Sequence, residues 1–261
     1  MKISIIIPAY NEEKRIGKTL EEYCKFFYSL KKQKTLDFEI LIVINNTKDK
    51  TEDVVKKYSK KYKEIRYLNF KQGGKGFAII EGFKDALKRD NDLIGFVDAD
   101  MSTSPKSYYD LIKNIGNYDG TIASRGLTDS VVKTSLKRKI NNKGFNFLVR
   151  SILFLPYKDT QCGAKIFRRN SIKSVLNELG ITQWAFDIDL LYRLRKKGFK
   201  IKEIPTVWDD KCGSSVSMLK TPIQMFFGVI RLRIINSPFK RFIMLYDKIP
   251  ESMKIHHNLI D

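Results

Sequence analysis

The chain has 261 residues, 43% of them hydrophobic, and a formal net charge of +20, with 49 Lys and Arg against 29 Asp and Glu. This composition excludes wholesale disorder. The three cysteines form no CxxC pair and the chain has only two histidines, so a disulfide framework and a zinc site are both poorly supported. No uncharged apolar stretch approaches about eighteen residues and the first residues do not read as a signal peptide, so a membrane-spanning helix is not expected.

The first half of the chain alternates strand-like and helix-like segments. Runs of β-branched and aromatic residues predict strands at residues 3–7, 38–44, 64–70, 93–97 and 120–124. Apolar residues at helical spacing predict a helix over residues 75–89. This alternation indicates an α/β fold with a mostly parallel sheet flanked by helices.

Polar loops follow the first four predicted strands, at residues 8–13, 45–51, 71–76 and 98–104. Ligands of such sheets bind beyond the carboxyl ends of the strands, so these loops are where a site is expected. Within the third loop, "GGKG" offers backbone amides and Lys75 to a phosphate at a helix N-terminus. The alternative is an ordinary flexible turn. The pattern is neither GxGxxG nor a P-loop, which argues against those two kinds of nucleotide site.

Two carboxylates, Asp98 and Asp100, directly follow the buried strand at 93–97. Like charges so close repel each other, and a divalent cation with hard oxygen ligands would remove that repulsion. The alternative is an Asx-type turn before a helix that starts at Pro105, with Ser102 or Ser104 as its N-cap. The position of the pair among the strand-end loops favours the metal site.

A different pattern begins near residue 130. Helices are predicted over residues 136–155 and 222–235, and a strand over 200–208. The first of these helices is expected to gather Ile140, Phe147 and other apolar residues on one side. Residues 133–173 contain eleven basic residues and one acid, which indicates an anionic partner. Helices of this kind are typical of proteins that lie on an anionic membrane surface. The alternative is that both helices pack against the sheet or a partner subunit.

Several motifs, taken together and in order, resemble a known family. They are "SIIIPAYNEEKRI" at the start, "GGKG", "DAD", "ASRG" (123–126), "DTQCGAKIFRR" (159–169) and "WAFDIDLL…EIPTVW" (184–208). The chain resembles the family 2 glycosyltransferases of the A-type, nucleotide-sugar-binding fold. Within that family it is most similar to the polyprenyl-phosphate glycosyltransferases, such as the dolichyl-phosphate mannose and glucose synthases. The resemblance runs from residue 3 to about residue 215.

This resemblance implies a role for each matching residue. The nucleotide-sugar pocket would be lined by Pro8, Ala9, Tyr10, Glu12, Asn45, Lys75 and Asp98. A divalent cation, Mg²⁺ or Mn²⁺, would be held by Asp98 and Asp100, with Ser102 near the ion. Catalysis would depend on Asp98, Asp100, Arg125, Arg138, Lys165 and Asp187, with Arg168 and Arg169 as further candidate cations. The sugar-side acceptor loop would consist of Trp184, Phe186, Asp187 and Asp189.

The chain departs from the family pattern after its second predicted strand. Where the family usually has Asp-Asp-Gly-Ser, this chain has Ile44-Asn45-Asn46-Thr47. Asn45 can accept a hydrogen bond from a base through its amide oxygen, but it carries no charge and can also donate. The base, uracil or guanine, is therefore left open, and a catalytically inactive nucleotide-sugar binder remains an alternative.

The expected reaction is the inverting transfer of a hexose from a UDP- or GDP-linked sugar to a polyprenyl or dolichyl phosphate, a step in protein glycosylation. An ionised acceptor phosphate needs no general base, because the second pKa of a phosphomonoester is about 6. The alternative acceptor is a saccharide or protein hydroxyl, with Asp187 as the base.

We further expect a catalytic domain at residues 1–215 and a C-terminal amphipathic basic segment at 216–261. The protein is expected at the cytoplasmic face of the membrane, peripherally bound to anionic lipid. A nucleic-acid partner is not expected, because no helix-turn-helix, RNP or zinc signature is present. The sequence leaves the oligomeric state open.

Overall fold

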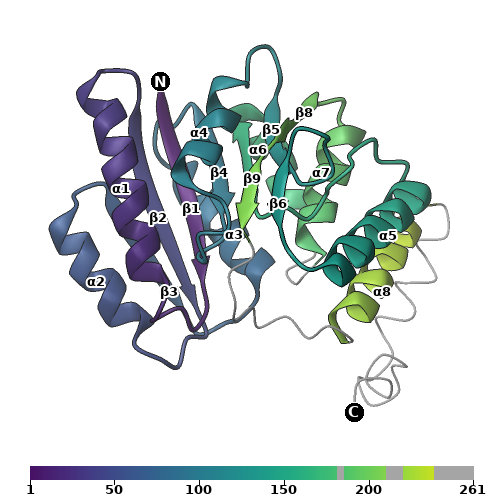
Figure 1. Cartoon of the computed structure of the whole chain (residues 1–261), viewed down its shortest axis with the longest axis horizontal. Coiled ribbons are helices and arrows are strands. Elements are labelled where there is room, and N and C mark those ends of the chain that lie inside the picture. Colours follow the sequence, from purple (N-terminus) through teal and green to yellow (C-terminus); the bar gives the residue numbers. More distant parts are fainter. Residues whose placement is uncertain (181–184, 210–219, 238–261) are drawn as a thin grey trace.

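The structure, a computed structural model, describes residues 1–180, 185–209 and 220–237. Figure 1 shows a sheet between two groups of helices. The strands are β1 (Lys2–Ala9), β2 (Asp37–Asn45), β3 (Ile65–Phe70), β4 (Leu93–Val97), β5 (Gly120–Ser124), β6 (Val131–Lys133), β7 (Ala164–Arg168), β8 (Ile201–Pro205) and β9 (Val207–Asp209). Among the described residues, seven of them form the main sheet, in the spatial order β3-β2-β1-β4-β7-β5-β8.

The main sheet is parallel except at β7, which runs antiparallel to its neighbours β4 and β5. The short strands β6 and β9 pair in parallel to form a second sheet. The predicted fold class, a mostly parallel sheet flanked by helices, is therefore confirmed. The single reversed strand brings the start of β7 to the carboxyl end of β4, where Val97 lies opposite Ala164.

Helices cover both faces of the main sheet. They are α1 (Ile16–Lys32), α2 (Thr51–Lys61), α3 (Lys75–Ala86), α4 (Pro105–Lys113), α5 (Leu136–Leu153), α6 (Arg169–Val175), the 3₁₀ turn η1 (Leu176–Glu178), α7 (Phe186–Lys196) and α8 (Lys220–Ile235). Helices α1, α2 and α4 pack on one face, and α3, α5, α6, α7 and α8 share the core on the other.

The strand β1 shows why these residues form a doubly covered strand. Ile3, Ile5 and Ile7 face the core beneath α1, and Ile6 faces the opposite core beneath α3. Alternation with a period of two sends successive side chains to opposite faces. Since both faces are covered by helices, apolar residues occur on both, as expected for a parallel sheet, with the buried Ser4 as the exception.

The predicted elements agree with the structure in the first half of the chain, where all five strands and the helix from Lys75 are present. The prediction of one strand over residues 200–208 is wrong, because the chain breaks at Thr206 into β8 and β9, which belong to different sheets. The strand β7 was not predicted. The expected boundary between residues 215 and 216 lies outside the described residues.

The helices α5 and α8 lie side by side at one end of the molecule (Figure 1). The apolar residues expected on one side of α5, Ile140 and Phe147 among them, do share a side, and that side is exposed to solvent. Val149 and Leu153 are buried in the core, whereas Ile140 and Phe147 are 61% and 71% exposed. The helix therefore keeps an exposed apolar face beyond what its packing on the molecule requires. Of the helices that the structure describes, none is at once long and apolar enough to cross a membrane.

Candidate active site

The carboxyl ends of β1, β2 and β4 and the start of β7 meet at one edge of the main sheet. The loops that leave these strands adopt unusual backbone conformations. Asn11, Asn46 and Met101 have φ angles of +52°, +48° and +61°. Non-glycine residues in this left-handed region are uncommon and often accompany functional sites. The polar loops predicted from the sequence are therefore brought together at this edge.

Asp98 is held from two sides. Its backbone amide donates to the carbonyl of Gly163 at 3.0 Å, and its Oδ1 lies 2.7 Å from the ammonium nitrogen of Lys75. A Cβ atom at Gly163 would lie 1.7 Å from Asp98 Oδ2, so only glycine fits beside this carboxylate. Burial raises the pKa of Asp98, the charges of Asp100 and Asp187 add to the rise, and Lys75 opposes it. The site thus concentrates negative charge that a cation would relieve.

Lys75 is the first residue of α3, and the turn before it requires glycine. Gly74 has φ +124°, a conformation that side chains other than glycine rarely adopt. Burial would lower the pKa of Lys75, but the charges of Asp98 and Asp187 outweigh it and raise the pKa well above its usual value. Lys75 therefore stays charged and faces the carboxylates.

Asp100 and Ser102 form the turn that the sequence left as an alternative to a metal site. The Ser102 amide donates to Asp100 Oδ1 at 2.9 Å, and Ser104 is the N-cap of α4, accepting from the Ser107 amide at 3.1 Å. The hydroxyl of Ser102, however, is buried and has no hydrogen-bond partner among the described residues. A buried hydroxyl without a partner is costly. The turn therefore leaves the Ser102 hydroxyl available as a ligand. A helix-capping turn and a metal site are compatible in this segment.

These residues fit a divalent cation. Two carboxylates and an unpartnered hydroxyl are the hard oxygen donors that Mg²⁺ and Mn²⁺ prefer. Within the part of the chain that the structure describes, no group of three or more His, Cys, Asp or Glu side chains is assembled for a metal. Asp98 Oδ1 is already paired with Lys75, and Asp100 Oδ1 already accepts from the Ser102 amide, so a cation would draw on the remaining carboxylate oxygens and the Ser102 hydroxyl. A bound cation would have to complete its shell with oxygens of a ligand or water.

Lys165 and Asp187 form a buried ion pair beneath the site. The Lys165 side chain is fully buried, and its ammonium donates to Asp187 Oδ1 at 2.5 Å and to the Cys162 carbonyl at 2.6 Å. Asp187 Oδ2 lies 3.7 Å from the Lys75 nitrogen. Burial would raise the pKa of Asp187, but Lys165 and Lys75 outweigh it and lower the pKa. In this arrangement Lys165 influences the site through Asp187 and has no exposed atoms with which to touch a phosphate.

The residues predicted to line the nucleotide pocket lie around the ends of β1 and β2. Pro8 and Ala9 end β1, and the ring of Tyr10 is 46% exposed beside them. Glu12 is paired with Arg15 at 2.6 Å. Burial and the nearby charges of Asp100 and Asp98 raise the pKa of Glu12 against the effect of Arg15.

Asn45 connects two of the site loops. Its Nδ2 donates to the Ala9 carbonyl at 3.2 Å, and its Oδ1 accepts from the Gly74 amide at 3.2 Å. The side chain is buried. An aspartate here would set a carboxylate against the Ala9 carbonyl, and only an amide can satisfy both partners. Asparagine in place of the family's aspartate thus allows residue 45 to hydrogen-bond both Ala9 and Gly74.

Two arginines lie on the other side of the site. Arg125 follows β5 and pairs with the buried Asp159 through Nε at 2.7 Å and Nη2 at 3.0 Å. Burial would raise the pKa of Asp159, but Arg125 outweighs it and holds the pKa at about 2. Arg138 stands in the first turn of α5. The guanidinium carbons of Arg125 and Arg138 lie 5.0 Å and 5.7 Å from the ring centre of Trp208.

Some candidate residues do not lie at the site. Arg168 faces the opposite edge of the sheet, opposite Leu93 at the start of β4, and both Arg168 and Arg169 donate to backbone carbonyls there. Phe186 is fully buried in the core, packed between aromatic rings. Asp189 pairs with Arg193 one turn along α7 at 2.6 Å. Trp184 lies outside the described residues.

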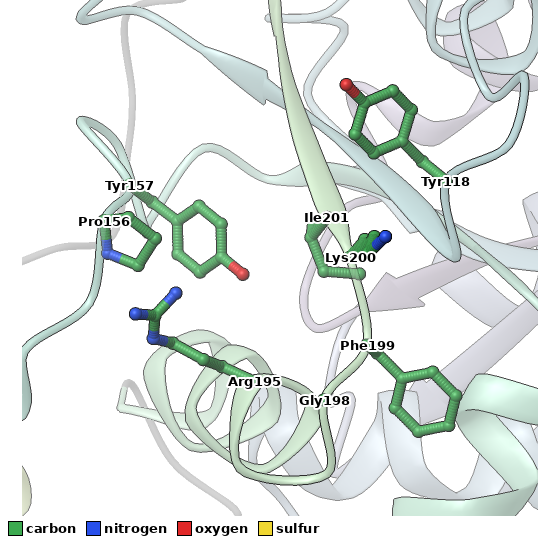
Figure 2. Close-up of a pocket in the computed structure, with 8 residues that line it drawn as sticks. All are labelled: Tyr118, Pro156, Tyr157, Arg195, Gly198, Phe199, Lys200 and Ile201. Atoms are coloured by element: carbon green, nitrogen blue, oxygen red, sulfur yellow. The ribbon is translucent and has the colours of Figure 1, made fainter.

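A cavity of about 450 Å³ lies at the other end of the main sheet, near the starts of β5 and β8. Figure 2 shows the Arg195 guanidinium and the Tyr157 ring converging on it. Its lining residues are Tyr118, Pro156, Tyr157, Arg195, Gly198, Phe199, Lys200 and Ile201. None of them is a predicted site residue, so this cavity is separate from the carboxylates.

Sequence reasoning missed three residues that build the site: Asp159, Gly163 and Trp208. Asp159 begins the quoted "DTQCGAKIFRR" motif but was given no role, and its isolation as the single acid in a basic segment was the available signal for pairing. Gly163 lies in the quoted "QCGAK" motif, but nothing in the sequence shows that β7 reverses and carries it to Asp98. Trp208 ends the quoted "EIPTVW" motif.

A mostly parallel sheet with aspartates and a facing lysine at its carboxyl edge is the arrangement expected of the A-type glycosyltransferase fold. A sequence profile described as Glycosyl transferase family 2 matches residues 4–176. The chain belongs to this family, which confirms the resemblance seen in its motifs.

Relatives in several organisms share most of the chain. A dolichyl-phosphate beta-glucosyltransferase of Dictyostelium discoideum is 33% identical over 88% of this chain and 73% of that protein. A protein of the same name in Drosophila melanogaster is 33% identical over 86% of this chain and 72% of its own length. The human protein of that name is 28% identical over 89% of this chain and 75% of its own length.

Solved structures share the fold. Glucosyl-3-phosphoglycerate synthase of Mycobacterium tuberculosis, crystallised with Mn²⁺, uridine diphosphate and phosphoglyceric acid, matches with a TM-score of 0.65 and 16% identity over 89% of this chain and 77% of that one. Mannosyl-3-phosphoglycerate synthase of Rubrobacter xylanophilus matches with a TM-score of 0.64 and 16% identity, over 97% of this chain and 79% of that one.

Proposed function

We propose that this chain transfers a hexose, and specifically glucose, from a nucleotide diphosphate sugar to the phosphate of dolichyl phosphate or a related polyprenyl phosphate. The observation that carries the proposal is that Asp98 pairs with Lys75 and lies, together with Asp100 and Arg125, at the carboxyl edge of the sheet. The relatives that share 33% of their residues over most of the chain are dolichyl-phosphate beta-glucosyltransferases, which supports both the sugar and the acceptor.

The acidic residues and the basic residues of the site have different electrostatic roles: the acids would hold a cation, and the basic residues would stabilise phosphates directly. When bound at Asp98, Asp100 and Ser102, a Mg²⁺ or Mn²⁺ ion would neutralise charge on the diphosphate of the donor. Lys75 adds a second positive charge beside Asp98, at the N-terminus of α3. Arg125, fixed by Asp159, presents its remaining N–H groups toward an anionic acceptor. Preorganised charge of this kind stabilises the leaving group as it departs.

A phosphate acceptor also agrees with the state of Asp187. The phosphate arrives ionised at neutral pH and attacks without a general base. Asp187 is the candidate base for a hydroxyl acceptor, but its pKa is lowered and its two oxygens face Lys165 and Lys75. A carboxylate with a lowered pKa is a weak base. We therefore favour the phosphate acceptor and attack from the face opposite the diphosphate, with inversion at the sugar carbon.

We also propose that α5 and α8 bring the site to the anionic, cytoplasmic surface of a membrane. Their exposed apolar side chains, together with that of Phe154 directly after α5, are Leu136, Ile140, Phe147, Phe154, Phe226 and Phe227. On α5 these stand beside the exposed cations Lys139, Lys143 and Arg150. Apolar side chains enter the interface while cations attract the lipid headgroups. A dolichyl or polyprenyl acceptor is itself anchored in that surface.

The test is a transfer assay with purified protein. Labelled UDP-glucose and GDP-glucose, each with Mg²⁺ or Mn²⁺, are supplied with dolichyl phosphate, with dolichol as the matched acceptor that lacks the phosphate. We expect label in the lipid product from dolichyl phosphate only, with the anomeric configuration opposite to that of the donor. Transfer to dolichol or to a free saccharide but not to dolichyl phosphate would overturn the proposal, as would the absence of transfer with every donor.

A further inference from the structure

The indole of Trp208 lies between groups that the proposed reaction uses. It is 6% exposed, and its ring centre is 5.0 Å from the guanidinium carbon of Arg125 and 5.7 Å from that of Arg138. Arg125 follows β5 and Arg138 belongs to α5, so the two arginines come from separate elements. A tryptophan ring is the aromatic group best suited to hold a cation against its face.

The backbone fixes this ring on both sides. Trp208 pairs with Val132 of β6 and forms an isolated antiparallel bridge with Thr103. The next amide, that of Asp209, donates to the carbonyl of Ser102 at 3.1 Å. The strand that carries Trp208 is therefore bonded directly to the loop that follows Asp100. The ring stands in a set position relative to the proposed metal ligands.

Two guanidinium groups beside one ring repel each other, and Asp159 offsets part of the charge of Arg125. Asp159 takes Nε and Nη2 of Arg125 and leaves the Nη1 group outside that ion pair. The aromatic face attracts both cations and limits the directions in which they can move. A pair of arginines held in this way suits a phosphate, whose oxygens accept several charge-assisted hydrogen bonds at once.

We propose that Trp208 is a positioning residue that holds Arg125 and Arg138 as a pair to receive the phosphate group of the acceptor. This inference rests on the proposed function for the identity of the acceptor. It adds that the indole, which touches neither sugar nor metal, sets the distance between the two cations. Loss of the ring should then weaken acceptor binding while donor binding is retained.

The experiment compares Trp208→Leu, which removes the aromatic face, with Trp208→Phe, which keeps one. Farnesyl phosphate serves as a soluble acceptor and farnesol as the control without a phosphate. For Trp208→Leu we expect the KM for farnesyl phosphate to rise about tenfold while the KM for the sugar donor changes less than about twofold. Trp208→Phe should restore most of the acceptor affinity. A fall in thermal stability with both KM values unchanged, or a failure of phenylalanine to restore affinity in a folded protein, would overturn the positioning role.

A second readout separates this inference from the proposed function. The chain has two tryptophans, so in a Trp184→Phe background the emission comes from Trp208 alone. Farnesyl phosphate should change this emission, and farnesol should not. A phosphate-specific change in emission, with no sugar transfer by the protein that retains Trp184, would contradict the proposed function and leave the role of Trp208 standing. No change in emission at concentrations that saturate transfer would overturn the role of Trp208.

Discussion

Two groups of basic residues in this chain show how differently the same charge can be used. At the site, Lys75, Lys165 and Arg125 each lie within 3 Å of a carboxylate oxygen and are largely or fully buried. On α5, Lys139, Lys143 and Arg150 are exposed next to exposed apolar side chains. The first group forms ion pairs with buried carboxylates. The second group is available to an anionic surface outside the protein.

The difference follows from the energetics of burial. A buried charge requires a partner, so each site cation is matched by an aspartate in a defined geometry. An exposed lysine needs no partner, and its contribution is felt over several ångströms by any anionic surface. The basic residues behind the net charge of +20 therefore serve at least two separate roles. Variants in the two groups should therefore fail in different assays.

The largest effect is expected for Asp100→Asn at the site. Replacing one carboxylate by an amide removes charge from the proposed metal ligands, and we expect turnover to fall by at least about a thousandfold. Mn²⁺ binding, measured calorimetrically without substrate, should be lost in parallel. The matched control is Asp110→Asn, because Asp110 is a 38% exposed carboxylate on α4 paired only with Lys113 in the described structure. Retained Mn²⁺ binding in Asp100→Asn would exclude its role as a ligand.

A large loss of stability is expected for Lys165→Met. Removing the ammonium leaves Asp187 buried with only the more distant Lys75, and breaking a buried ion pair costs about 3–5 kcal/mol. Urea unfolding measures this change. The double variant Lys165→Met/Asp187→Leu should recover part of the loss, because no unpaired charge then remains. In the exposed group, Lys139→Met should change the free energy of unfolding by less than about 0.5 kcal/mol. Equal losses in both single variants would contradict the comparison.

The ion pair of Arg125 and Asp159 should be visible in the pH dependence of stability. The pKa of Asp159 is about 2 in the folded protein, against about 3.9 in an unfolded chain. Since the folded pKa is the lower one, this stabilisation is complete above about pH 5 and is lost as the pH falls toward 2. It amounts to roughly 2.5 kcal/mol. Asp159→Asn should flatten the fall of the unfolding free energy between pH 5 and 3, and an unchanged slope would refute the assignment.

Much of the fold and part of the site could be predicted from the sequence. The strands of the first half are continuous apolar runs, and the polar loops after them marked Asp98, Asp100 and Lys75 correctly as neighbours. Local pattern is sufficient there because each loop leaves the same edge of a parallel sheet.

The rest depends on contacts between residues far apart in the chain. The strand β7 has a buried lysine at its second position, which hides its apolar character, and its antiparallel direction has no local signal. Lys165 meets Asp187 22 residues later. The break at Thr206, which separates β8 from β9, likewise depends on pairing with β6. Tertiary partners, and not local propensity, decide these features.

The smallest effect is expected for charge reversal in the exposed group. Each basic residue near an anionic bilayer contributes about 1 kcal/mol of attraction. The double variant Lys139→Glu/Lys143→Glu should therefore weaken binding to liposomes that contain phosphatidylserine by at least about tenfold, as measured by flotation at low salt. Turnover with soluble farnesyl phosphate should be unchanged, because neither lysine contacts the site.

The control for this last variant has the same change in net charge at a different place. Lys32 and Lys34 are exposed near the end of α1, on a part of the molecule distant from α5 (Figure 1). If α5 faces the bilayer, Lys32→Glu/Lys34→Glu should bind liposomes almost as well as the unaltered protein. Equal weakening in the two double variants would mean that net charge alone drives binding. Because surface attraction is screened by salt, the difference between the variants should also shrink as ionic strength approaches about 1 M, where the Debye length is about 3 Å.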